Sequence, residues 1–115
     1  MTQSPENIQI YERKLQMLRQ KFIEGLHTRI LTLEQYAIEF RAGENNHEVL
    51  DAIRHECHKL AGVAASFGFP DIGSRASEID TAITSGTMTR DGVSESLEDL
   101  MNEMEDLLDN AQTNS

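Results

Sequence analysis

Apolar residues recur every three or four positions along most of the chain, and this spacing constrains the fold more than any other feature. The first such stripe runs from Tyr11 to Phe40 and contains no proline. Residues three and four apart share one face of an α-helix, so the stripe predicts a long amphipathic helix. Gly25 is its weak point, and we expect the helix to break or kink near this residue.

Three further stripes of the same period follow, over residues 50–67, 72–83 and 93–111. Short runs of turn-forming residues separate them. Gly43 can end the first helix, and the asparagine pair that follows can cap the second. Pro70 fits the first turn of the third helix, and Thr87 or Thr89 can cap the last. We therefore predict an all-α fold, an up-down four-helix bundle with an additional N-terminal helix or helical extension.

Length and composition place limits on this bundle. The 115 residues suit a single domain over 1–115, with an ordered core over about 8–110 and polar ends outside it. Without tryptophan, we expect an aliphatic core. The net charge of −10 disfavours nucleic acid and anionic membrane surfaces as partners. Such a bundle can bury its stripes internally, so we expect a monomer.

Other features point to the cytoplasm as the compartment. The longest apolar runs are far shorter than the roughly 20 residues that cross a bilayer, and no basic region followed by an apolar run opens the sequence. Cys57 is the one cysteine, which excludes an internal disulfide. The sequence thus predicts a soluble helical domain, and its function has to come from a site.

One exposed histidine stands out. Cys57 belongs to the apolar stripe of the second helix, and a helix turns about 100° per residue. His58 should therefore lie beside the buried seam and reach solvent. Three of its four neighbours on that face are small, namely Ala61, Gly62 and Ala65, and the fourth is Arg54. Gly62 costs helix stability, which suggests either a closely packed neighbouring helix or the approach of a partner to the imidazole.

An imidazole in such a setting can carry a phosphoryl group. It is largely neutral near pH 7, and its lone pair can attack phosphorus to form a phosphoramidate. The sequence contains no glycine-rich phosphate loop and no lysine motif of the Walker type. We expect no bound cofactor and no metal site, so the Mg²⁺ that phosphoryl transfer needs would come with a partner.

The segment His58-Lys-Leu-Ala-Gly-Val-Ala-Ala-Ser-Phe-Gly-Phe69 resembles the signature of histidine phosphotransfer (HPt) domains. In that signature the histidine is followed by leucine, glycine, small residues and an apolar-Gly pair, here Phe67 and Gly68. The Ser-Phe-Gly-Phe part is similar to the phosphotransfer domain of chemotaxis kinases. The order and length of the helices agree as well, so the resemblance covers roughly residues 8–108.

The resemblance implies roles for individual residues. His58 would be the phosphoacceptor. The family often has a polar residue 22 positions later, here Asp80, which would hold the imidazole or the phosphoryl group. From its own position Asp80 can equally be an ordinary surface acid. The family's frequent lysine three residues after the histidine is Ala61 here, and Arg54 or Lys59 could replace part of its charge.

The implied function is that of a phosphorelay intermediate rather than an enzyme. His58 would accept a phosphoryl group from a receiver-domain aspartate or a kinase and pass it to another receiver. The partners would be receiver domains of response regulators or hybrid histidine kinases, which would dock over Ala61, Gly62, Ala65 and Gly68. The alternative is a binding module that modulates a receiver or kinase without being phosphorylated, as the missing lysine allows.

Overall fold

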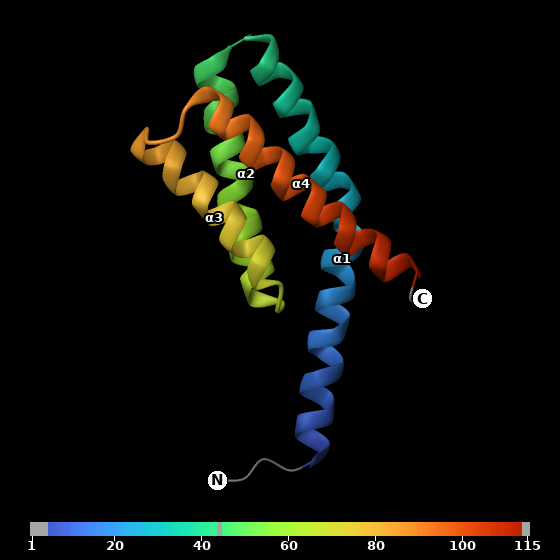
Figure 1. The fold of residues 1–115 in the computed structure, drawn as a ribbon. Helices are drawn as coiled ribbons and strands as arrows, with labels where there is room; N and C mark the ends of the chain where they lie inside the picture. Colours follow the sequence, from blue (N-terminus) through green and yellow to red (C-terminus); the bar gives the residue numbers. More distant parts are fainter. Residues whose placement is uncertain (1–4, 44, 114–115) are drawn as a thin grey trace.

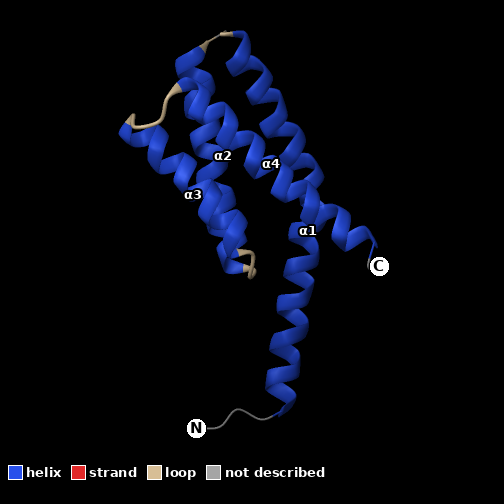
Figure 2. Cartoon of the chain, in the orientation of Figure 1, coloured by secondary structure: helices blue, strands red, loops and turns tan. Residues whose placement is uncertain are grey.

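The computed structural model of the chain describes residues 5–43 and 45–113 and shows four α-helices in this part of the sequence, with no strand. These are α1 (Pro5–Ala42), α2 (Asn46–Ser66), α3 (Pro70–Ser85) and α4 (Arg90–Thr113). Figure 2 shows the helices and the short loops between them. The predicted all-α bundle is confirmed.

Each helix packs against two neighbours in an up-down arrangement. Contacts join α1 to α2, α2 to α3, α3 to α4 and α4 back to α1, so α1 and α3 lie on one diagonal and α2 and α4 on the other. In Figure 1, α2 and α3 form one side of the bundle and α1 and α4 the other. The short loops force successive helices to run in opposite directions.

Residues at the helix ends stand close to their predicted positions. Gly43 has a φ of +79° and follows the last residue of α1, and Gly86, with a φ of +66°, ends α3. Pro70 is the first residue of α3, where a missing N–H costs nothing. The Thr89 hydroxyl accepts a hydrogen bond of 3.0 Å from the Gly92 amide and so caps α4.

The start of α2 differs from the prediction. Asn45 precedes the helix in the left-handed conformation, with a φ of +45°, and its side chain makes no capping hydrogen bond. Its carbonyl accepts the first helical bond from the Val49 amide. Asparagine tolerates this backbone conformation better than most residues, which explains its use at the turn.

The core is aliphatic for the most part, but the prediction of a purely aliphatic core was wrong. Phe22 and Phe40 are buried among its leucine, isoleucine and alanine side chains. Phe67 and Phe69 pack against Phe22, with ring centroids 6.3 and 5.2 Å away. These aromatic contacts hold the α2–α3 turn on α1. Such pairs contribute about 0.5–1.5 kcal/mol beyond their buried area.

α1 is one uninterrupted helix of 38 residues, so the predicted break near Gly25 is wrong. A Cβ built on Gly25 would contact nothing within 4 Å, and the helix continues through this residue without interruption. The first part of α1 projects beyond the bundle in Figure 1. Tyr11 and Leu18 are exposed there, although they continue the stripe that is buried from Phe22 onwards. The predicted helical extension is confirmed.

The two ends of the chain are more helical than predicted. Residues 5–7 belong to α1 and residues 112–113 to α4, whereas we expected an ordered core over about 8–110. The remaining residues of both ends lie outside the described part of the chain. None of the described helices combines the length and apolar character that a membrane span needs.

Candidate functional site

α2 presents His58 to solvent, as its apolar pattern predicts. The residues that turn toward the core on α2 include Ile53, Cys57 and Leu60, all at most 2% exposed. His58 is one position beyond Cys57, and its side chain is 70% exposed. The imidazole is therefore open to a partner while its helix is anchored on both sides of it.

Asp80 on α3 lies against His58. It follows the buried Ile79, and its side chain is only 19% exposed. Its Oδ2 lies 2.8 Å from Nδ1 of His58. A carboxylate at this distance accepts the Nδ1–H hydrogen bond, which fixes the tautomer and leaves the Nε2 lone pair available. The contact with His58 favours a role for Asp80 in holding the imidazole over that of an ordinary surface acid.

Arg54 and Lys59 are both engaged with acids. The guanidinium of Arg54 lies 3.7 Å from the second oxygen of Asp80 and 3.2 Å from Asp51. Lys59 pairs with Glu56 at 3.0 Å. Arg54 therefore lies beside the Asp80 carboxylate that contacts His58. Both cations have a carboxylate neighbour.

His58 stands between two surface hollows. The α2–α3 hollow has a volume of about 510 Å³ and is lined by His58, Ala61, Gly62, Ala65, Pro70, Gly73, Ser74, Ser77 and Asp80. The α1–α2 hollow has a volume of about 600 Å³ and is lined by Arg29, His58, Lys59, Gly62, Val63, Ser66 and Phe67. The structure thus brings three of the predicted docking residues together on the α2–α3 side.

Two glycines shape the α2–α3 hollow in different ways. A Cβ on Gly62 would contact nothing within 4 Å, so packing of a neighbouring helix does not explain this glycine. A Cβ on Gly73 would lie 3.4 Å from the backbone of Ala61 and Ala65. Gly73 thus lies at the contact between α3 and α2, on the same helix as Asp80. The sequence signal for it was its spacing of seven residues from Asp80, which puts both on one face of α3.

Gly68 does not line either hollow, in contrast to the other predicted docking residues. It has a φ of +85° in the turn after α2, a conformation that favours glycine. Arg19 of α1 covers this turn and donates a hydrogen bond of 2.7 Å to the Phe67 carbonyl. Gly68 therefore ends the helix that carries His58 and positions the next one.

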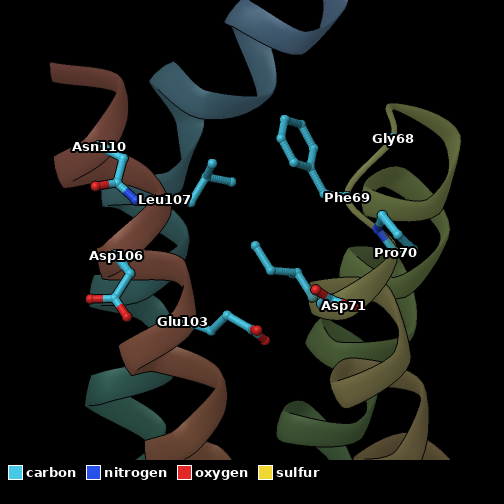
Figure 3. Close-up of a pocket in the computed structure, with 9 residues that line it drawn as sticks. Gly68, Phe69, Pro70, Asp71, Glu103, Asp106, Leu107 and Asn110 are labelled. Atoms are coloured by element: carbon cyan, nitrogen blue, oxygen red, sulfur yellow. The ribbon is translucent and has the colours of Figure 1, made fainter. Parts of the chain in front are cut away.

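A third surface hollow includes neither His58 nor Asp80, although Pro70 also lines it. This hollow of about 360 Å³ lies between the start of α3 and the second half of α4 and is shown in Figure 3. Asp71, Glu103 and Asp106 are among its lining residues, and Glu103 pairs with Arg75 at 2.7 Å. Across residues 5–43 and 45–113, no cluster of three histidine, cysteine or acidic side chains could hold a metal ion.

Cys57 has no access to the site although it adjoins His58. Its side chain is fully buried, and burial raises the pKa of the thiol to about 12, with smaller contributions from the charges of Asp80 and Glu56. A thiol in this state is a poor nucleophile and a poor metal ligand. Of these two side chains, the His58 imidazole is the exposed one.

Comparison with known proteins agrees with this geometry. The family model described as "Hpt domain" matches residues 17–114, which include His58, Asp80 and all four helices except the projecting start of α1. Neither the curated proteins nor the solved structures contain a significant match. Hpt domains are helical phosphocarriers of phosphorelays. With its four-helix bundle and a match over most of its length, the chain belongs to the Hpt domain family.

Proposed function

We propose that the protein is a phosphorelay intermediate and that His58 is its phosphoacceptor. One observation carries the proposal: the imidazole is 70% exposed while its Nδ1 lies 2.8 Å from a largely buried carboxylate. An ordinary surface histidine has no reason to be held in one orientation. A carrier has such a reason, because Nε2 must meet a phosphorus atom in line with the bond that breaks.

In this mechanism the partner supplies the phosphoryl group as an aspartyl phosphate. The Nε2 lone pair forms a bond to phosphorus as the bond from phosphorus to the aspartate oxygen breaks, and the aspartate leaves as a carboxylate. The proton on Nδ1 stays on the ring, which becomes positively charged. Asp80 stabilises that charge through the hydrogen bond already present. The same steps in reverse pass the group to a second receiver.

The docking surface in this proposal surrounds His58 and includes the α2–α3 hollow. Ala61, Gly62 and Ala65 give it a shallow floor, and Pro70 and Gly73 continue this floor on α3. The free space beyond Gly62 leaves room for a partner's backbone to approach, so that its aspartyl phosphate can come within bonding distance of His58. Mg²⁺ bound to the receiver would supply charge neutralisation for the transferred group.

The partners in this proposal are receiver domains of response regulators or hybrid histidine kinases, which act in the cytoplasm. The protein has a second candidate role, as a module that docks on a receiver or kinase without being phosphorylated. Ala61 in place of the usual lysine supports it. The ordered His58–Asp80 pair favours the carrier, because docking alone requires no oriented nucleophile.

The test is transfer from a receiver that carries radiolabelled phosphate on its aspartate. We expect label on the protein that is stable to base and labile to acid, as a phosphohistidine is. His58→Gln should abolish the label. His55→Gln is the matched control, because His55 is also exposed and lies one turn earlier on α2. Label that persists in His58→Gln would exclude His58, and binding without label across several receivers would favour the docking role.

A further inference from the structure

The two hollows beside His58 differ in charge. Apart from His58, the single ionisable side chain that lines the α2–α3 hollow is Asp80. The α1–α2 hollow is lined by two cations, Arg29 and Lys59, and by no acid. A phosphoryl group on nitrogen carries up to about two negative charges. It is repelled by the carboxylate and attracted by the two cations.

The orientation of the imidazole agrees with this difference. Nδ1 of His58 points to Asp80 on α3. Nε2 lies on the other side of the ring, and a group bonded to it extends away from Asp80. The α1–α2 hollow, which His58 also lines, offers about 600 Å³ on the surface next to α2. Gly62 and Ser66 are among the small residues there.

Arg29 is the cation with an unused charge. Arg54 contacts Asp51 and Asp80, and Lys59 pairs with Glu56. Arg29 is half-buried on α1, and within residues 5–43 and 45–113 it has no ion pair or hydrogen bond. A guanidinium has five N–H donors in a planar fork that matches phosphate oxygens. Because Arg29 is half-exposed in an open hollow, its donors are hydrated in the free protein and can bind an anion that enters the hollow.

We propose that the α1–α2 hollow holds the phosphoryl group of phosphorylated His58 and that Arg29 donates hydrogen bonds to its oxygens. Arg29 then supplies, from a different helix, the positive charge that Ala61 lacks. The inference rests on the proposed function and deepens it. While the P–N bond forms and the P–O bond to the receiver's aspartate breaks, Arg29 neutralises the phosphoryl oxygens and Asp80 the positively charged ring.

The experiment uses the full chain and phosphoramidate, a small phosphoryl donor that needs no docking surface. The rate of labelling of His58 is measured for wild type, Arg29→Ala, Arg29→Gln and Arg29→Lys. Arg13→Ala is the control, because Arg13 is exposed on the projecting part of α1. Losing a hydrogen bond to a charged group should slow labelling about 10- to 100-fold in Arg29→Ala and Arg29→Gln. Arg29→Lys should recover part of the rate.

A second measurement distinguishes a contact with the phosphoryl group from a structural role. The ³¹P chemical shift of phosphorylated His58 is followed against pH. A cation beside the group favours its dianion, so the shift should titrate at higher pH in Arg29→Ala than in wild type and in Arg13→Ala. Labelling and titration that match wild type in Arg29→Ala and Arg29→Gln would overturn the inference.

The failure of this inference and that of the proposed function are distinguishable. Wild type that takes up no label from phosphoramidate or any receiver, or label that survives His58→Gln, refutes the proposed function and this inference with it. Wild type labelled on His58, together with unaffected Arg29 variants, refutes the role of Arg29 alone. Circular dichroism of each variant confirms that the bundle is intact.

Discussion

Nδ1 of His58 and Oδ2 of Asp80 lie 2.8 Å apart, between two helices that a single turn connects. The carboxylate is largely buried and holds one nitrogen of the ring, whereas the rest of the histidine side chain is exposed to solvent. α3 lies close to α2 at Gly73, where a Cβ would be 3.4 Å from backbone atoms of Ala61 and Ala65.

The first prediction concerns this pair. Asp80→Asn keeps the size of the side chain but removes its charge, so the imidazole loses its preference for one tautomer. Removing an orienting partner typically lowers activity about 10- to 100-fold, and we expect transfer from a phosphorylated receiver to slow by that factor. ¹⁵N NMR of the His58 ring should show one tautomer in wild type and a mixture in the variant.

Asp51→Asn is the control for this variant. Asp51 pairs with Arg54 on the same surface but makes no contact with the ring in the described structure. It should keep both the wild-type rate and the single tautomer. A wild-type rate in Asp80→Asn would show that orientation of the ring does not limit transfer.

The second prediction separates the effect of Gly62 on the stability of the protein from its effect on phosphoryl transfer. Alanine is favoured over glycine inside a helix by about 1 kcal/mol, and a Cβ at position 62 meets no atom within 4 Å. Gly62→Ala should therefore raise the free energy of unfolding by about 0.5–1 kcal/mol, as measured by urea denaturation. Transfer from a receiver should slow, because the methyl group occupies the space that the partner enters.

Gly25→Ala provides the comparison, since a Cβ there also meets nothing within 4 Å. The residue lies on α1 and lines neither hollow at His58. We expect a similar gain in stability with unchanged transfer. If Gly62→Ala also transfers at the wild-type rate, the open space at Gly62 has no role in docking.

A third prediction concerns Arg90, which joins the start of α4 to the end of α1. Its guanidinium donates hydrogen bonds to the Phe40 carbonyl and, over 3.0 Å, to Asn46, and it lies 4.3 Å from the centroid of the Phe40 ring. Arg90→Ala removes all three contacts and should lower the free energy of unfolding by about 1–3 kcal/mol. Arg13→Ala, on the projecting part of α1, should change it by less than about 0.5 kcal/mol.

The fourth prediction concerns the reactivity of Cys57. Burial raises the pKa of its thiol to about 12, so almost no thiolate forms at pH 8 in the folded protein. A thiol reagent such as iodoacetamide should leave native Cys57 unmodified for as long as the bundle stays folded, and should modify it rapidly in concentrated urea. Fast modification of the native protein would contradict the burial.

The same thiol affects stability at high pH. Folding raises the pKa of the thiol from 9.0 to about 12, so the unfolded chain loses this proton more readily than the native one. The contribution to stability is complete below pH 9 and falls as the pH rises from 9 toward 12. Urea denaturation between pH 7 and 10.5 should show this decline in wild type, and a weaker decline in Cys57→Ala.

Periodicity and turn residues determined the helices. The apolar stripes predicted which side of α2 is buried, and hence that His58 is exposed next to Cys57. Gly43, Pro70 and Thr89 marked helix ends, because their backbone and hydroxyl preferences act within one turn of the chain. The His58 segment also indicated the family. All of these signals are local, which is why a single sequence reveals them.

The contacts between helices were decided by the tertiary structure alone. No spacing within a segment shows that Arg29 of α1 lines a hollow with His58, or that Arg90 lies over the ring of Phe40. The unbroken α1 and its exposed start also depend on the tertiary structure. Leu18 continues the apolar stripe that includes Phe22, but it lacks a neighbouring helix to pack against and is therefore exposed. Burial depends on which helices reach a given level of the bundle, and this depends on their lengths and crossings rather than on the residues of one helix.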